Sequence, residues 1–152
     1  MRRPLLEIRS SPIQGLGAFA RRRIRKGTRI IEYVGELITP LVADSRYDDS
    51  QVENPHVLLF SVDKHTVIDA GVGGNESRFI NHSCQPNCET VIKNKHVFIE
   101  SLRTISEGEE LTYDYNLTRE DQDDEELEKR YSCNCGAKTC RGTMLKPRPL
   151  HR

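Results

Sequence analysis

The chain has 152 residues, and its 23 Lys and Arg balance 23 Asp and Glu, so it carries no formal net charge. A chain of this length can bury a core without disulfide bonds, and we predict one domain. No apolar run approaches a membrane span and no secretory signal opens the sequence, which indicates a soluble intracellular protein with no membrane partner. In such a compartment, five cysteines favour thiolate ligands over disulfides.

The charge is unevenly distributed, because residues 1–30 hold nine Lys or Arg against one Glu. Arg21, Arg22 and Arg23 could approach phosphate, but most runs of this kind are solvated basic faces. The chain has no Trp, and no aromatic residue is interleaved among these arginines. A platform for single-stranded nucleic acid is therefore disfavoured, and we expect any contact with nucleic acid to be indirect at most.

The first half of the chain is predicted to form short strands and turns. The predicted strands are residues 4–9, 19–24, 29–34, 57–62 and 65–69. Ser10 to Gly17 (SSPIQGLG) is a turn, and the segments on either side of Lys26-Gly27 are predicted to pair as a hairpin that 33–38 continues. A brief helix is expected within residues 40–50, because Pro40 suits a helix start.

The second half continues this pattern, so the sequence predicts a mostly β domain without internal repeats. The predicted strands are residues 89–93, 96–102 and 111–115. The first two form a hairpin that turns at Asn94, and residues 105–110 supply a further turn. Residues 119–130 hold seven carboxylates and are typical of a solvated helix or linker.

The segment Arg78 to Cys88, RFINHSCQPNC, is dense in side chains that can bind a ligand. One interpretation is a polar turn in which Asn and Ser bond the backbone and Pro86 fixes one φ angle. We favour a segment that holds a small molecule and a metal, because nearly every position offers a donor, an acceptor or a soft ligand. The pair Gly15-Leu16-Gly17 could also let backbone approach a ligand, although turn geometry alone explains such a pair about as often.

A second cluster is Cys133-x-Cys135-x-x-x-x-Cys140 near the C-terminus. Structural zinc is usually bound by four tetrahedral N or S ligands, so one ligand must come from elsewhere in the chain, and Cys84 or Cys88 could supply it. Ordinary buried thiols are the alternative, but so short and polar a tail offers little core to bury them.

Five motifs together resemble the SET-domain protein-lysine methyltransferases with a post-SET zinc segment, especially those of trithorax type. They are Gly15-Leu16-Gly17, EYVGE (Glu32 to Glu36), GNESRFINHSC (Gly74 to Cys84), EELTYDY (Glu109 to Tyr115) and CNCGAKTCRG (Cys133 to Gly142). They occur in the family's order and span nearly the whole chain. No pre-SET cysteine cluster and no reader domain accompanies them.

The resemblance implies a mostly β fold, the β-clip or SET fold, of small curved sheets. In it, the RFINHSC segment and the strand ending in YDY cross to form a pseudoknot, a topology that sequence rules do not give because threaded chains are rare. It also implies a SET domain over residues 1–117, an acidic linker or helix over 118–130 and a post-SET zinc segment over 131–147.

The family encloses S-adenosylmethionine between the G-x-G turn, the Asn-His pair and the post-SET segment, while the acceptor lysine enters through a channel from the opposite face. By matching position, the implied cofactor contacts are Gln14, Gly15, Leu16, Gly17, Tyr33, Arg78, Phe79, Asn81, His82, Tyr115 and Asn134. The implied ligands of one structural zinc ion are Cys84, Cys133, Cys135 and Cys140, which leaves Cys88 free.

The implied catalytic residues are Tyr115, Tyr33 and Tyr113. A lysine ammonium, with a pKa near about 10.4, has no lone pair, and desolvation and the positive sulfonium both lower that pKa. Entry from opposite faces aligns amine, methyl and sulfur, and this alignment can lower the activation barrier by on the order of 7 kcal/mol. Tyr115 and Tyr33 would orient the amine and polarise the methyl, whereas Tyr113 would disfavour repeated transfer, so we expect mainly monomethyl-lysine with some dimethyl-lysine.

One departure from the family is Leu58, which stands where a tyrosine is usual and removes a hydroxyl from the lysine side of the site. Residues 39–54, which shape peptide recognition in the family, are too generic to name a target.

The sequence thus predicts transfer of methyl from S-adenosylmethionine to a lysine of a histone or another basic DNA-associated protein. The alternative is a binding module, either a catalytically weak SET-like domain or a zinc-bearing domain that binds protein or nucleic acid. A eukaryotic source would place the protein in the nucleus on chromosomes, and a bacterial source would place it in the cytoplasm or in a host.

Overall fold

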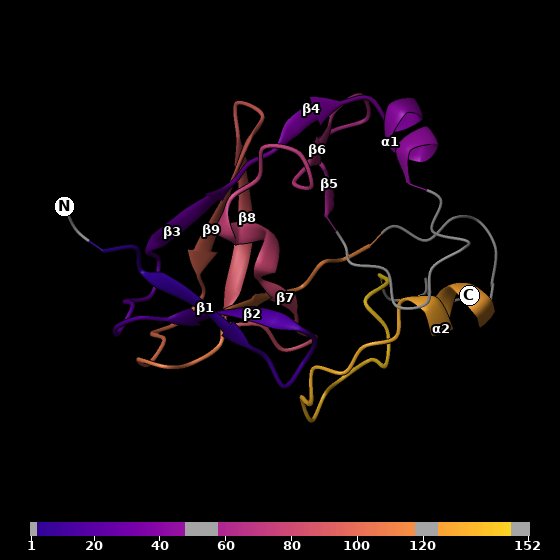
Figure 1. Cartoon of the computed structure of the whole chain (residues 1–152). Coiled ribbons are helices and arrows are strands. Elements are labelled where there is room, and N and C mark those ends of the chain that lie inside the picture. Colours follow the sequence, from indigo (N-terminus) through magenta and orange to yellow (C-terminus); the bar gives the residue numbers. More distant parts are fainter. Residues whose placement is uncertain (1–2, 48–57, 118–124, 147–152) are drawn as a thin grey trace, which may run out of the picture.

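A computed structural model describes residues 3–47, 58–117 and 125–146 (Figure 1). Within these ranges, ten short strands form four small sheets, and the α-helices are few and short. The predicted mostly β fold of small sheets is therefore confirmed. None of the described helices is long and apolar enough to cross a membrane.

The first sheet is an antiparallel hairpin of β1 (Leu6–Ser10) and β2 (Leu16–Ala20). The turn between these strands closes with a hydrogen bond from Ser11 N to the Gly15 carbonyl at 2.8 Å, and Gly15 has a φ of 46°, which suits glycine. The hairpin predicted on either side of Lys26-Gly27 is wrong, because β2 pairs with the strand before it and not with the strand after it.

The second sheet has the order β3 (Arg29–Tyr33), β9 (His96–Ser101) and β8 (Cys88–Lys93), all antiparallel. The β8–β9 hairpin turns at Asn94 as predicted, where Asn94 and Lys95 have positive φ values of 51° and 66°. Strand β3 obtains its hydrogen bonds from β9, far along the chain. Between β2 and β3, Ile24 bonds with Ile105 after β9, and Gly27 and Thr28 bond with Ser101 at the end of β9.

The third sheet has the order β4 (Glu36–Ile38), β6 (Val67–Asp69) and β5 (Leu59–Ser61). Helix α1 (Pro40–Arg46) follows β4, capped by the Thr39 hydroxyl, and confirms the helix expected there up to Arg46; residues 48–50 lie outside the described ranges. Asp69 is fully buried and accepts hydrogen bonds from Arg46 Nη1 at 3.0 Å and from the Tyr47 hydroxyl, so it ties the helix to the sheet.

The centre of the molecule is a parallel pair of two-residue strands, β7 (Asn81–His82) and β10 (Thr112–Tyr113). The 3₁₀ helix η2 (Glu76–Phe79) leads into β7. The strand predicted over 111–115 is thus shorter than expected. The two segments that were expected to cross lie side by side, although the pseudoknot itself stays a prediction.

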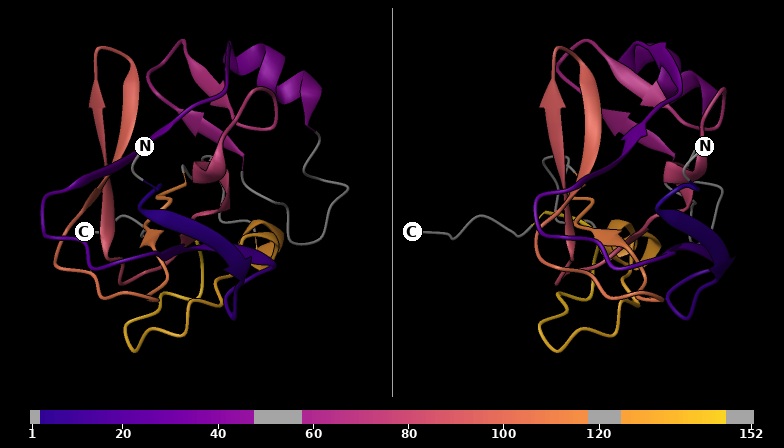
Figure 2. Two further views of the ribbon diagram at one scale, coloured as in Figure 1. Left: turned by 60° about the vertical axis from the view of Figure 1, so that its left-hand side comes forward. Right: turned by 90° about the vertical axis from the view of Figure 1, so that its left-hand side faces the viewer.

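A single main core joins the first, second and central sheets around Ile80, Ile99, Ile105 and Leu111, and Tyr113 is part of it. Both views of Figure 2 place the third sheet and α1 at one end of the molecule and the C-terminal tail (residues 131–146) at the other. Helix α2 (Glu125–Arg130) precedes the tail and confirms a helix in the acidic segment, of which residues 118–124 lie outside the described ranges. The proposed domain boundaries stay a prediction.

Candidate active site

A pocket of about 290 Å³, partly open to solvent, lies where three distant segments meet. They are the β1–β2 turn, the central parallel pair and the C-terminal tail. The lining residues are Ile13, Gln14, Asn81, His82, Tyr115, Ser132, Cys133, Asn134 and Met144. The structure thus brings together five of the predicted cofactor contacts in one partly open pocket.

Asn81 ties the β1–β2 turn to the centre of the pocket. Its Nδ2 lies 3.2 Å from the Gln14 carbonyl and 3.1 Å from the Leu16 carbonyl, and it also faces Ser11 Oγ at 3.2 Å. An amide group can donate two hydrogen bonds, so these acceptors share it. Asn81 therefore sets the position of the turn whose residues line one wall.

Glu110 is a residue of this site that sequence reasoning missed. Its carboxylate accepts hydrogen bonds from Ser11 Oγ at 2.8 and 2.9 Å and from Asn81 Nδ2 at 3.0 Å. A Cβ on Gly17 would lie 2.4 Å from Glu110 Oε2, so glycine at this position leaves room for the carboxylate. The close approach explains Gly17 as a packing residue beside the pocket, and Glu110 as the group that holds the turn and Asn81 together.

We expect Glu110→Gln to weaken binding of S-adenosylmethionine about tenfold, because an amide cannot accept the same bonds from Ser11 and Asn81 on both of its atoms. Isothermal titration calorimetry measures the Kd. Glu107→Gln is a matched control, since Glu107 is exposed on the neighbouring turn. Equal affinities for the two variants would show that Glu110 does not position the wall.

His82 lies in the opposite wall and connects it to the cysteines. Its Nδ1 accepts a hydrogen bond from Tyr115 N at 2.9 Å, and its Nε2 lies 3.4 Å from Cys84 Sγ. Burial lowers the pKa of His82 to about 4, with Asp114 opposing the change. The ring is therefore neutral at physiological pH, and the bond to Nδ1 assigns the proton to Nε2.

Of the three predicted catalytic tyrosines, Tyr115 lines the pocket, and Tyr113 and Tyr33 lie near Tyr115. The Tyr113 and Tyr115 rings lie 4.8 Å apart between centroids, and the Tyr33 phenol is close enough to raise the pKa of both. Burial is the largest cause of the raised pKa in all three. All three phenols thus remain protonated at physiological pH and can donate hydrogen bonds, but cannot serve as ready bases.

Two of these hydroxyls already have backbone partners. Tyr115 Oη donates to the Ile80 carbonyl at 2.5 Å, and Tyr33 Oη donates to the Leu58 carbonyl at 2.8 Å. Each donated proton fixes the direction of the oxygen and leaves its lone pairs for another donor. Leu58, where a tyrosine was expected, thus contributes its backbone to the site.

The four cysteines predicted to bind zinc converge, with their sulfur atoms all within 4.8 Å of one another. Cys84 Sγ lies 3.8 Å from Cys133 Sγ and 3.9 Å from Cys140 Sγ. Zn–S bonds of about 2.3 Å in a tetrahedron would place sulfurs about 3.8 Å apart, so the cluster fits the ion. Cys88 lies elsewhere, buried in the main core with 1% exposure.

Backbone N–H groups of the tail point at these sulfurs, as they would at thiolates. Arg141 N lies 3.3 Å from Cys84 Sγ, and Cys135 N lies 3.4 Å from Cys133 Sγ. Burial raises the pKa of the Cys84 and Cys133 thiols, whereas N–H groups and the neighbouring thiols outweigh burial at Cys135 and lower its pKa to about 6. The convergence of four sulfurs, with N–H groups directed at them, suits a metal that takes thiolate ligands.

An ion pair holds the tail against the segment that carries Tyr113 and Tyr115. Arg141 binds both oxygens of Asp114, at 2.9 and 3.1 Å, and also donates to the Leu145 carbonyl at 3.3 Å. Backbone bonds join Leu117 to the tail at Met144 and Lys146. The tail thereby supplies Asn134 and Met144 as a wall of the pocket.

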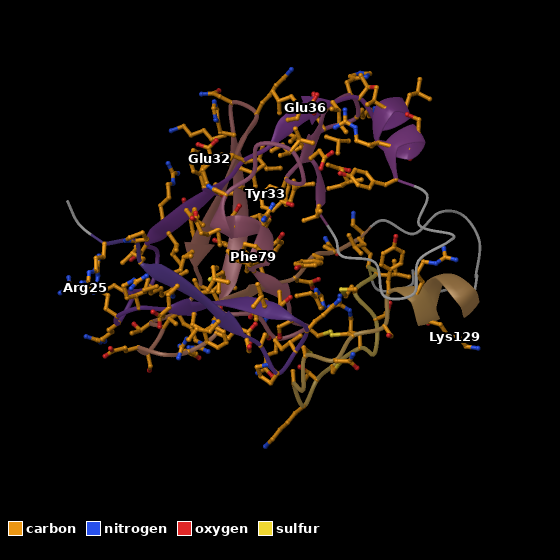
Figure 3. All side chains as sticks on the ribbon, in the orientation of Figure 1. Arg25, Glu32, Tyr33, Glu36, Phe79 and Lys129 are labelled. Carbon is orange, nitrogen blue, oxygen red and sulfur yellow. The ribbon has the colours of Figure 1, made fainter. Side chains whose placement is uncertain are left out.

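The remaining predicted cofactor contacts do not line this pocket. Arg78 and Phe79 belong to η2, where the Arg78 guanidinium lies 4.7 Å from the centre of the Phe79 ring. Tyr33 and Phe79 both lie in the middle of the molecule in Figure 3. Gly15 belongs to the β1–β2 turn that Asn81 holds, and Leu16 and Gly17 begin β2. Ile13, Ser132 and Met144 line the pocket without having been predicted, since no motif singles them out.

Comparison with known proteins shows which family this chain is similar to. The SET domain family matches residues 15–116. The histone-lysine N-methyltransferase trithorax of Drosophila virilis is 42% identical over 137 residues, covering 86% of this chain and 3% of that protein. The histone-lysine N-methyltransferase set-2 of Caenorhabditis elegans is 41% identical over 150 residues, covering 94% and 9%.

The human histone-lysine N-methyltransferase 2B is 42% identical over 135 residues, covering 86% of this chain and 5% of that protein. The chain thus spans less than a tenth of the length of these three relatives. The family match extends over most of the chain and contains the β1–β2 turn from Gly15, the central parallel pair and the tyrosine strand. The chain therefore belongs to the SET domain family.

Proposed function

We propose that the protein transfers methyl from S-adenosylmethionine to the ε-amine of a protein lysine, with a histone as substrate. The observation that carries the proposal is Tyr115, which lines the pocket on one side and packs against Tyr113 on the other. A lysine amine and a methyl group that meet beside Tyr115 would therefore contact buried phenol groups. Related proteins named as histone-lysine methyltransferases support the substrate class. In a eukaryotic cell, a histone substrate would place the protein in the nucleus on chromosomes.

The residues that line the pocket have different roles in the proposed reaction. Gln14, Asn81, His82 and Asn134 offer the polar groups that would bind the cofactor, which when bound supplies a methyl group on a positive sulfonium. The phenols cannot accept the proton of the lysine ammonium, because burial keeps them protonated. The amine therefore loses its proton to water before its nitrogen bonds to the methyl carbon and the carbon–sulfur bond breaks.

The zinc cluster has a structural part in the proposal. One ion bound by Cys84, Cys133, Cys135 and Cys140 would fix the tail, and with it Asn134, against the pocket. Four protein sulfurs would complete its coordination and leave no open position for chemistry.

Incubation with radiolabelled S-adenosylmethionine and core histones tests the proposal. We expect label on lysine, identified by mass spectrometry of the labelled peptides. Absence of transfer to histones, to free histone peptides and to a cell lysate, in a preparation that binds the cofactor, would leave the binding-module alternative as the function.

We expect Tyr113→Phe to shift the product from monomethyl-lysine toward dimethyl- and trimethyl-lysine. The Tyr113 hydroxyl makes no hydrogen bond with any described residue, so it is available to a water or to the amine. Its loss frees the space and the bond that hinder a methylated amine from turning its lone pair toward the sulfonium. A bias of about 1.4 kcal/mol between successive transfers changes the product ratio about tenfold.

Mass spectrometry of a methylated peptide over time measures this distribution. The parent protein should accumulate mainly monomethyl-lysine. Abundant trimethyl-lysine from the parent, or an unchanged distribution in the variant, would show that Tyr113 does not set the number of methyl groups. Because Leu58 replaces a tyrosine near the lysine side, Leu58→Tyr is an informative companion and should narrow the distribution further toward monomethyl-lysine.

A further inference from the structure

The basic N-terminal surface is concentrated on one turn between β2 and β3. We call it the cationic turn, and its charged members are Arg22, Arg23, Arg25 and Lys26. All four side chains are exposed, and none forms an ion pair with a residue that the structure describes. By contrast, the flanking Arg21 pairs with Glu7 and Arg29 pairs with Glu100. Four positive charges are therefore left uncompensated on a chain that is neutral overall.

The backbone of the cationic turn is fixed although its side chains are exposed. Ile24 is buried and exchanges two backbone hydrogen bonds with Ile105, at 2.9 and 2.8 Å. The Arg25 carbonyl accepts from the hydroxyls of Ser101 at 2.7 Å and Thr28 at 2.6 Å. A partner that binds here would have to order only side chains, which reduces the entropic cost of association.

The position of the turn leaves the pocket accessible. Figure 3 shows Arg25 at the left edge of the molecule, well separated from the sulfur atoms of the tail in the same view. None of the four charged residues of the cationic turn lines the pocket. This surface is independent of the methyl-transfer chemistry proposed above.

The chemistry of the turn selects the partner. Arginine guanidinium groups bind phosphate through paired hydrogen bonds, and closely spaced cations favour a partner with dense, regular negative charge. Double-stranded DNA carries one phosphate charge per about 1.7 Å of axis. A membrane surface would call for exposed apolar side chains among the cations, but the large apolar residue of the turn, Ile24, is buried. No aromatic residue is present in the turn to stack on bases.

We propose that the cationic turn is a docking surface for the phosphate backbone of double-stranded DNA. This departs from our expectation that contact with nucleic acid is indirect. The sequence alone does not show that these four side chains lack ion pairs with the described residues, or that their backbone is held in place. These two features distinguish a binding surface from a solvated face.

Fluorescence anisotropy of the full chain with a labelled duplex of about 20 base pairs, at KCl concentrations from about 25 to 200 mM, tests the proposal. Four phosphate contacts predict a slope of log K against log salt of about −3 to −4. The variant Arg22→Gln/Arg23→Gln/Arg25→Gln/Lys26→Gln should bind at least about tenfold more weakly at the lowest salt and should lose most of that slope. Circular dichroism and zinc content confirm that it is folded.

A matched control removes the same charge elsewhere. The exposed lysines outside the turn that serve this purpose are Lys64, Lys93, Lys129 and Lys138. Their fourfold replacement by Gln should leave DNA affinity within about threefold of the parent. The proposal is overturned if both variants lose affinity equally, if the turn variant retains it, or if the parent fails to bind duplex at the lowest salt. Equally tight binding to polyglutamate or to anionic vesicles would also overturn it.

Discussion

Tyr115→Phe should reduce kcat about 100-fold while the Kd for S-adenosylmethionine changes less than about threefold. Tyr115 lines the pocket, and burial keeps its hydroxyl protonated with its direction fixed by the Ile80 carbonyl. The hydroxyl oxygen thus lies ready for the reacting amine, and its loss removes an interaction that acts in the transition state and not mainly in the ground state. Single-turnover transfer to a histone peptide measures the rate, and calorimetry measures the Kd.

The variant also leaves the Ile80 carbonyl without its partner, which destabilises the fold by about 1–3 kcal/mol, so rates are to be compared well below the unfolding transition. Tyr47→Phe provides a control, because Tyr47 likewise loses a hydrogen bond, to Asp69, but at the helix α1 end. Its transfer rate should stay within about threefold of the parent. A Tyr115→Phe rate within about twofold of the parent would make Tyr115 a packing residue.

Replacement of one cysteine ligand should abolish zinc binding and release the tail that forms one wall of the pocket. We expect about one zinc per chain in the parent, and almost none in Cys135→Ser, because three thiolates bind the ion far less tightly than four. Without the ion, the tail that supplies Ser132, Asn134 and Met144 loses its anchor. The affinity for S-adenosylmethionine should then fall at least about tenfold.

Elemental analysis and calorimetry on the same samples measure both effects. Cys88→Ala is the matched control, since Cys88 is buried in the main core away from the cluster, and alanine avoids placing a hydroxyl there. It should retain zinc even if its unfolding temperature falls. Zinc retained in Cys135→Ser, or lost in Cys88→Ala, would show that the ligand set is different.

Prediction from the sequence was most specific where a residue's chemistry restricts its role. Thiols have few alternatives to metal binding in a short polar tail, so three candidate ligands could be read from their spacing. The fourth could not be chosen from spacing, because Cys84 lies 49 residues before Cys133 and Cys88 was equally available; the family resemblance was needed. In the structure the Cys84 sulfur lies within 4.8 Å of those of Cys133, Cys135 and Cys140.

Strand partners were harder to predict than strands. Residues 29–34 favour β structure for reasons of side-chain shape, and β3 forms there, but propensity does not say which strand will pair with it. The pairing is decided by the bridge between Ile24 and Ile105, a contact between residues far apart in the chain. Strands that are joined by a short turn are expected to pair with each other. Here that expectation was wrong, because β2 pairs with β1 and β3 pairs with β9.

Glu110 shows why a site residue can escape sequence analysis. It stands in a Glu-Glu pair next to a turn, where a solvated carboxylate is the ordinary outcome. Its role arises from Ser11 and Asn81, which are distant in sequence, and from the missing side chain of Gly17. Only the fold brings these groups together, so no local pattern could have identified it.

The ion pair between Asp114 and Arg141 has a consequence for biosynthesis. Asp114 lies between Tyr113 and Tyr115 in the chain, so the segment that carries these phenols is joined to the tail by an ion pair. A ribosome would release the tyrosines into the folding domain well before Arg141 and the last cysteine emerge. A nascent or truncated chain that ends at residue 130 would therefore lack one pocket wall, and we expect newly made protein to bind cofactor only once residues 131–146 have left the ribosome.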